Sequence, residues 1–128
     1  MYRVPPNCKF ILDNLEYEWT YPENQLFDYI HQRGLAGSIK DWPGLFRQAL
    51  KHLEPNGLFE IQEFEFEFHS EKPEGLTENS AIMQWQKWID KASVGMGKQL
   101  NCAANLNTKL EDAGFTEITF EVVKVCKV

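Results

Sequence analysis

Long apolar runs and an excess of basic residues are both missing from this sequence. No segment reaches the roughly 18 apolar residues that a transmembrane helix needs, and residues 1–10 lack the apolar stretch of a secretory signal. Lys and Arg total 13 against 19 Asp and Glu, and the resulting net charge of -6 repels nucleic-acid phosphates and anionic lipids. We therefore expect an intracellular protein, cytoplasmic or nuclear, that binds neither nucleic acid nor membrane.

Cysteine pairs and glycine-rich loops are missing as well. Cys8, Cys102 and Cys126 are an odd number without metal-ligand spacing, which favours reduced thiols and no metal site. The single G-x-G, at residues 95–97, follows an expected helix and does not join a strand to a helix N-terminus, so it is unsuited to cradle phosphates. No P-loop and no Ser/His/Asp order is present, which argues against hydrolase chemistry.

What is present is the composition of one folded domain. Of the 128 residues, 43% are hydrophobic and 25% are charged, values ordinary for a globular protein, so we expect a single domain over residues 1–128. After Asp41, a good N-cap residue, apolar side chains recur at i, i+3 and i+4 and predict a helix over 42–53. Two further helices are expected over 80–94 and 105–113.

Four apolar or β-branched segments predict strands. They lie at 8–12, 26–31, 58–69 and 116–128. A strand, a helix and a second strand between Leu26 and Phe68 are typical of a parallel β-α-β unit, so the sequence predicts an α/β fold.

Several conspicuous side chains allow two interpretations. A metal site or an acid/base pair is one interpretation of Glu60, Glu63, Glu65 and Glu67. Because three of them alternate with phenylalanines over 63–68, a solvated face opposite a core face is favoured. His52 and His69 lack companions at ligand spacing and are expected on the surface. Met83, Trp85 and Trp88 follow a helical stripe, which is typical of core packing but leaves an apolar substrate pocket open.

Several short motifs resemble class I S-adenosylmethionine-dependent methyltransferases, and those of fungal secondary metabolism and its regulators most closely. They are the lead-in Val4–Asn7, the segment Glu18–Thr20, the strand end Ile30–Arg33, the turn Leu53–Leu58, the pair Gln62-Glu63 and the turn Ala113–Phe115. Each motif is weak alone, but their order and spacing extend over nearly the whole chain.

The resemblance implies roles for particular residues. In this family the acidic residue after the third strand borders the adenine of the cofactor, a place that Asp13 and Asn14 occupy. A turn that simply ends the expected strand is the other interpretation of these two residues, and without the rest of the pocket it is favoured. The segment after the fourth strand lines the methionine side of S-adenosylmethionine, which points to His31, Arg33 and Gly34. His31 is also the candidate catalytic base, because imidazole titrates near neutral pH; an ordinary hydrogen-bonding role is the more common one for a lone histidine.

The resemblance also implies that parts of the family fold are missing. The family's glycine-rich loop and first two strands precede the matched region, and a seventh strand follows it. We therefore expect a truncated Rossmann-like sheet of about four strands and three helices, in which S-adenosylmethionine binding is doubtful. Because unpaired buried strand edges cost about 1–3 kcal/mol per group, we expect rearranged pairing, a homodimer or a complementing subunit.

Three functions follow as hypotheses. The first is a methyltransferase-derived protein that does not methylate unaided and either complements another chain or binds or cyclises a small apolar metabolite. The second is a residual methyltransferase whose pocket is rebuilt across a dimer. The third is an interaction module that adds a partner's strand to its exposed sheet edges.

Overall fold

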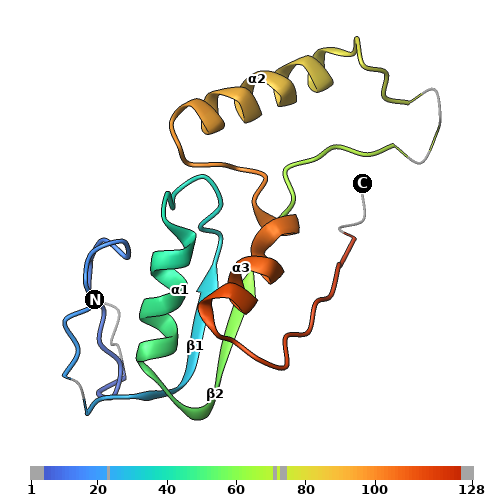
Figure 1. Ribbon diagram of the computed structural model, residues 1–128. Helices are drawn as coiled ribbons and strands as arrows, with labels where there is room; N and C mark the ends of the chain where they lie inside the picture. Colours follow the sequence, from blue (N-terminus) through green and yellow to red (C-terminus); the bar gives the residue numbers. More distant parts are fainter. Residues whose placement is uncertain (1–4, 23, 71, 73–74, 125–128) are drawn as a thin grey trace.

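The computed structural model describes residues 5–22, 24–70, 72 and 75–124. Its elements in chain order are the strand β1 (Phe27–Arg33), the helix α1 (Trp42–Lys51), the strand β2 (Leu53–Gln62), the helix α2 (Ala81–Gly95), the short 3-10 helix η1 (Ala103–Asn105) and the helix α3 (Leu106–Ala113). Figure 1 shows β1 and β2 side by side, with α1 along them. The mixed α/β content and the three α-helices agree with the sequence prediction.

The centre of the fold is a parallel β-α-β unit, as predicted. Strands β1 and β2 pair in parallel, with His31 opposite Glu60 and Gln32 opposite Ile61. The register is irregular near Phe27, where β2 carries Gly57. A Cβ at Gly57 would lie 3.0 Å from the carbonyl oxygen of Phe27, so this close strand approach requires glycine.

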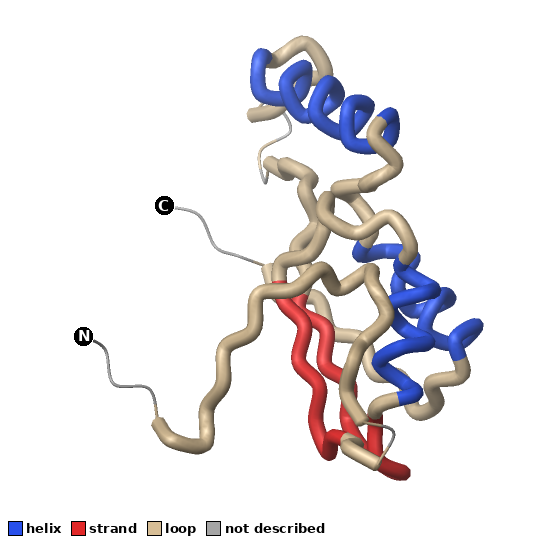
Figure 2. The backbone as a smooth tube through the Cα atoms, turned by 90° about the vertical axis from the view of Figure 1, so that its left-hand side faces the viewer, coloured by secondary structure: helices blue, strands red, loops and turns tan. Residues whose placement is uncertain are grey.

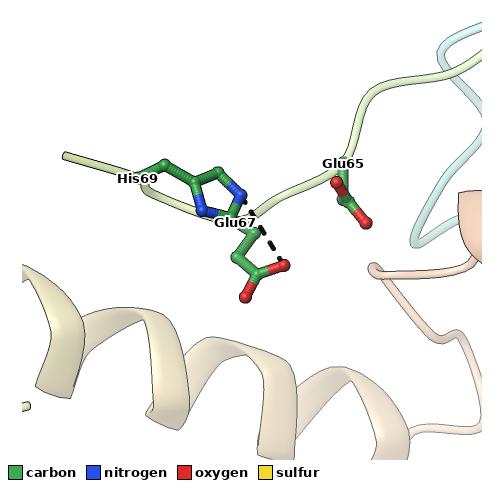
Figure 3. A group of neighbouring side chains, drawn as sticks. All are labelled: Glu65, Glu67 and His69. Carbon is green, nitrogen blue, oxygen red and sulfur yellow. Dashed lines mark ion pairs between the residues drawn. The ribbon is translucent and has the colours of Figure 1, made fainter. Parts of the chain in front are cut away.

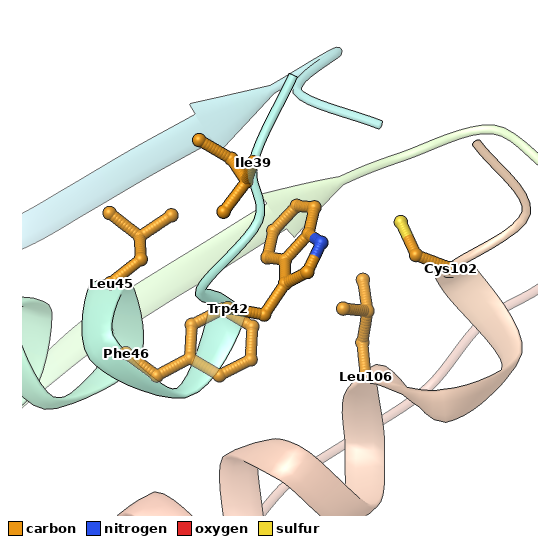
Figure 4. Packing of buried hydrophobic residues seen from close by; sticks show 6 residues of the cluster. All are labelled: Ile39, Trp42, Leu45, Phe46, Cys102 and Leu106. Carbon is orange, nitrogen blue, oxygen red and sulfur yellow. The ribbon is translucent and has the colours of Figure 1, made fainter. Parts of the chain in front are cut away.

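The core lies on one face of the two-stranded sheet. Figure 4 shows six of its buried residues, Ile39, Trp42, Leu45, Phe46, Cys102 and Leu106. Phe59 and Ile61 of β2 pack against this cluster. Figure 2 shows α1 and α3 on the same side of the strands, and on the opposite face Tyr29 and Leu58 are 50% and 61% exposed. Only one sheet face is therefore covered by helices of the described chain.

Helix α1 begins and ends as local rules require. The Asp41 side chain accepts a hydrogen bond from the backbone N–H of Gly44 at 2.9 Å, and Pro43 occupies the first turn, where no N–H is needed. At the other end the His52 ring donates from Nδ1 to the Gln48 carbonyl oxygen at 2.8 Å. His52 is 4% exposed, so its predicted surface position is wrong; it closes the helix and packs beside Trp19.

Two of the predicted strands are absent from the described residues. Residues 8–12 form an irregular segment, with Phe10 83% exposed, because no neighbouring strand is available to pair with them. Residues 116–124 are likewise irregular; the rest of the predicted 116–128 strand, 125–128, lies outside the described residues. The sheet that the structure describes has two strands, where about four were predicted.

The predicted strand 58–69 is shifted along the chain. It begins earlier, at Leu53, and ends at Gln62. Beyond it the backbone N–H groups of Phe66 and Phe68 donate to the side chains of Asn101 and Gln86, at 2.8 and 2.9 Å, and not to a strand. The alternation of phenylalanines and glutamates over 63–68 therefore belongs to an extended segment that has no strand partner among the described residues.

Helix α2 stands apart from the β-α-β unit. Figures 1 and 2 show it at one end of the molecule, joined by two loops. Ser93 is its one buried residue, while Trp88 is 69% exposed and Val94 55% exposed. None of the described helices is both long enough and apolar enough to cross a bilayer.

Candidate functional site

A cavity of about 250 Å³ lies where β1 ends. Three consecutive residues of β1, His31, Gln32 and Arg33, line it, and because side chains alternate along a strand, that of Gln32 points to the face opposite those of His31 and Arg33. Its apolar wall consists of Leu15, Trp19, Leu35, Leu45 and Phe59. The carboxyl ends of parallel strands are where open α/β sheets bind their ligands, so this cavity is the candidate site.

The segment before β1 is tied to helix α1. The carboxylate of Glu16 accepts hydrogen bonds from the backbone N–H groups of Lys40 and Asp41, at 2.8 and 2.9 Å, and these bonds lower the pKa of Glu16. The backbone N–H of Trp19 donates to Gln48 Oε1 at 2.8 Å. These contacts hold Trp19 at the cavity wall, although the segment that carries it has no regular structure.

The loop after β1 is held by one carboxylate. Glu63 accepts hydrogen bonds from the backbone N–H groups of Leu35 and Ala36, at 2.7 and 3.1 Å, and a further bond from Gln32 Nε2. Gly34 turns the chain with φ +65° just before these residues. Since Gln32 and Leu35 both line the cavity, Glu63 fixes two parts of its wall.

His31 belongs to a hydrogen-bonded cluster on the exposed sheet face. Its Nδ1 lies 2.7 Å from Glu60 Oε2, to which the Tyr29 hydroxyl also donates. Hydrogen bonds lower the pKa of the Glu60 carboxyl, that from Tyr29 most, followed by those from Gln62 and His31. The same contact with Glu60 raises the pKa of Tyr29. An ionised carboxylate only accepts hydrogen bonds, so Nδ1 of His31 carries a proton, and in the neutral form of the ring Nε2 therefore has the lone pair.

We expect replacement of Glu60 by alanine to reverse the tautomer of His31. At a pH of about 8.5, where histidine is neutral, the Nδ1–H form should dominate in the unmodified chain and lose its majority in Glu60→Ala. Ring 15N chemical shifts measure the two forms. In the control Gln62→Ala the bond to Glu60 remains, and His52, bonded to a carbonyl oxygen, serves as an internal reference. An unchanged tautomer in Glu60→Ala would show that the carboxylate does not orient the ring.

Comparison with known proteins decides the family. The family described as "Methyltransferase domain" matches residues 5–119. The chain belongs to this methyltransferase family. It is 35% identical over 115 residues to Methyltransferase cpsF of Aspergillus campestris, covering 89% of this chain and 40% of that protein. It is 34% identical over 122 residues to Methyltransferase pytC of Aspergillus terreus, covering 95% of this chain and 37% of that protein.

A regulator of secondary metabolism is similar as well. The chain is 33% identical over 123 residues to the Secondary metabolism regulator laeA of Aspergillus flavus, covering 93% of this chain and 32% of that protein. The chain thus spans two fifths or less of the length of these relatives. No solved structure matches it significantly.

The residues that the methyltransferase resemblance assigns to the cofactor fall into two places. His31 and Arg33 line the cavity, and Gly34 follows them directly. Asp13 and Asn14 lie in an exposed turn, where Asp13 Oδ1 accepts from the Asn14 N–H at 2.7 Å. Neither residue lines the cavity, but Leu15, the next in the chain, does. Their cofactor roles stay predictions.

The predicted substrate residues of the methyltransferase domain lie elsewhere. Trp85 of α2 packs against Phe66 and Phe68, with ring centroids 5.5 and 6.2 Å away. Neither Trp85, Trp88 nor Met83 lines the cavity beside His31. The structure therefore does not bring these three residues together with the other predicted site residues, and their role in substrate binding stays a prediction.

One acidic group outside the cavity resembles a metal site in composition. Figure 3 shows Glu65, Glu67 and His69 on the extended segment after β2, with the possible ligand atoms within 4.8 Å of one another. His69 Nε2 lies 3.8 Å from Glu67 Oε2. All three residues are exposed, and exposed acidic groups commonly gather without a cation, so we interpret the group as a surface ion pair.

Sequence reasoning missed the two carboxylates that hold His31 and the loop after β1. Glu60 was grouped with the other glutamates, and Glu63 was assigned to a solvated face, whereas the structure shows each of them accepting several hydrogen bonds. The parallel register, with His31 opposite Glu60, is the signal that finds this pair. A sequence shows that register only after the strand limits are known.

Proposed function

We propose that the residues lining the cavity at the end of β1 form the methyl-acceptor side of an S-adenosylmethionine-dependent methyl-transfer site of secondary metabolism. The observation that carries this proposal is the cavity at the carboxyl end of β1, in which the segment around Trp19 meets His31 and Arg33. This edge of a parallel sheet is where ligands bind in open α/β folds. The family membership and the two named methyltransferases among the relatives support the same reaction class.

His31 supplies the proton chemistry in this proposal. S-adenosylmethionine, when bound, supplies the methyl group. As an acceptor oxygen or nitrogen takes the methyl group, its proton passes to Nε2 of the neutral His31 ring, which has the free lone pair because the Glu60 contact places the ring proton on Nδ1. Glu60, 2.7 Å from Nδ1, orients the ring and stabilises the cation that forms.

The described residues fit an acceptor better than they fit the whole cofactor. A cavity of about 250 Å³ is smaller than the roughly 300–1,000 Å³ of sites for drug-sized ligands. Before β1 no described helix offers backbone N–H groups at its N-terminus to the cavity. We therefore propose that the cofactor is held jointly with backbone from outside these 128 residues, in a longer chain or in a partner.

Titration with the cofactor tests this proposal. The 128-residue chain should show no saturable heat with S-adenosylmethionine or S-adenosylhomocysteine up to about 1 mM. A chimera that joins the family's first two strands and glycine-rich loop ahead of Pro5 should bind both with micromolar affinity and lose methyl transfer by about 100-fold or more in His31→Ala. Micromolar binding by the chain alone, or full activity of the His31→Ala chimera, would overturn the proposal.

A protein partner is the natural source of further strands. Among the described residues β1 and β2 pair only with each other, so each strand has one outer edge without a strand partner. We propose that a second copy or a complementing subunit adds a strand there. Light scattering on the titration samples reports the mass of the assembly.

The second candidate is a repurposed binding protein for a small apolar metabolite. The apolar wall of the cavity, with Trp19 and Phe59 among its five apolar residues, favours it. Chemistry by His31 separates the two candidates, because a binding protein does not need an oriented base.

A further inference from the structure

The extended segment after β2 is hydrogen-bonded along one side only. The backbone N–H groups of Phe66 and Phe68 donate to two side-chain amide oxygens, at 2.8 and 2.9 Å. Successive N–H groups of an extended chain point to opposite sides, so those of Glu65 and Glu67 point away from these two acceptors. Neither of these two N–H groups has a hydrogen-bond partner among the described residues. The segment therefore presents one free backbone edge.

The side chains of this segment alternate between two faces, as those of a β-strand do. The rings of Phe66 and Phe68 both pack against Trp85, with centroids 5.5 and 6.2 Å away. Glu65 and Glu67 are exposed, and a carboxylate oxygen of one lies within 4.8 Å of a carboxylate oxygen of the other (Figure 3). One face is thus apolar and the other is acidic, which is the pattern of a strand at the edge of a sheet.

The acidic face selects the kind of strand that can pair with this edge. Opposite charges on neighbouring strands stabilise a sheet, whereas like charges directly opposite each other destabilise it. A second copy of the segment would set glutamate against glutamate, in a chain whose net charge is already -6. The glutamates therefore disfavour pairing between copies and leave the edge open to a strand that carries Lys or Arg.

We infer that residues 64–68 form a docking edge for an extended basic segment of a partner protein, which adds to them as a β-strand. Carbonyl groups of the partner accept hydrogen bonds from the N–H groups of Glu65 and Glu67, as in other strand additions. Its basic side chains lie beside the two carboxylates, and its alternate, apolar side chains continue the face of Phe66 and Phe68. None of residues 64–68 lines the cavity beside His31, so this interaction is separate from the proposed methyl transfer.

A peptide of about eight residues that alternates lysine with valine tests the inference. In titrations of the 15N-labelled 128-residue chain, it should bind saturably, shift the backbone amides of residues 64–68 and slow the hydrogen exchange of the Glu65 and Glu67 amide protons. A second peptide of the same composition, with its lysines grouped at one end, has the same charge but no alternation. It should bind at least about fivefold more weakly and leave that exchange unchanged.

Two double variants separate pairing at this edge from general attraction between opposite charges. Glu65→Gln with Glu67→Gln should weaken binding of the alternating peptide about fivefold, because both ion pairs are lost. Glu111→Gln with Glu117→Gln removes the same charge from exposed positions elsewhere and should weaken binding by less than about twofold. Each of four results would overturn the inference: no saturable shift at residues 64–68, unchanged exchange of the Glu65 and Glu67 amides in the complex, equal binding of the two peptides, or equal losses in the two double variants.

Discussion

Replacing Phe46 by alanine should lower the free energy of unfolding by about 3–5 kcal/mol. The Phe46 side chain is 0% exposed and sits between Trp42 and Phe59, with ring centroids 5.6 and 5.9 Å away. Removing the ring loses the free energy gained by burying it and leaves a cavity between α1 and β2. The backbones of these two elements prevent the cavity from closing. Urea unfolding followed by circular dichroism measures the loss.

Phe64→Ala provides the control for the same chemical change. Phe64 is 53% exposed and follows the end of β2, so its loss should alter the free energy of unfolding by no more than about 0.5 kcal/mol. A Phe46→Ala loss below about 1 kcal/mol would mean that the cluster around Phe46 is not the core that stabilises the fold.

The second large effect concerns the loop beside the cavity. Glu63→Ala should lower the free energy of unfolding by about 2–3 kcal/mol, because the N–H groups of Leu35 and Ala36 lose their acceptor together with Gln32 Nε2. The amide protons of Leu35 and Ala36 should also exchange faster with solvent, since the loop opens more often. Unfolding in urea and hydrogen exchange by NMR measure the two effects.

Two variants separate this role from simple loss of charge. Glu63→Gln keeps an oxygen acceptor and should lose less than about 1 kcal/mol, whereas Glu65→Ala removes an exposed neighbouring carboxylate and should change stability by about 0.5 kcal/mol or less. If Glu65→Ala destabilised the chain as much as Glu63→Ala, the loop contacts of Glu63 would not explain its effect.

Helix predictions succeeded because their signals are local. The stripe from Trp42 to Ala49, the N-cap Asp41 and the glycine after α3, with φ +104°, each act within a few residues. The strands at 8–12 and 116–124 failed for the opposite reason. A strand needs a partner across the sheet, and the composition of the segment by itself does not supply one.

The same difference between local signals and contacts across the fold separates the site residues that the sequence predicted from those that it missed. His31 and Arg33 follow from the resemblance at the end of an expected strand, and both line the cavity. The pairing of Glu60 with His31 and that of Glu63 with Gln32 were not predicted, because the parallel register sets the first and the folding of the loop at 34–36 sets the second. Trp85 was predicted near a substrate, yet α2 lies apart from the β-α-β unit.

The sequence by itself determined the helices, the β-α-β unit and the methyltransferase resemblance, since these depend on periodicity and on motifs read along one chain. Only the tertiary structure decided which carboxylate orients His31 and which one holds the loop after β1. Those pairings join residues about 30 positions apart, such as His31 and Glu60. A hydrogen bond between such residues forms only when donor and acceptor are positioned to within a few tenths of an ångström. Strand register and packing set these positions, and the order of residues along the chain does not.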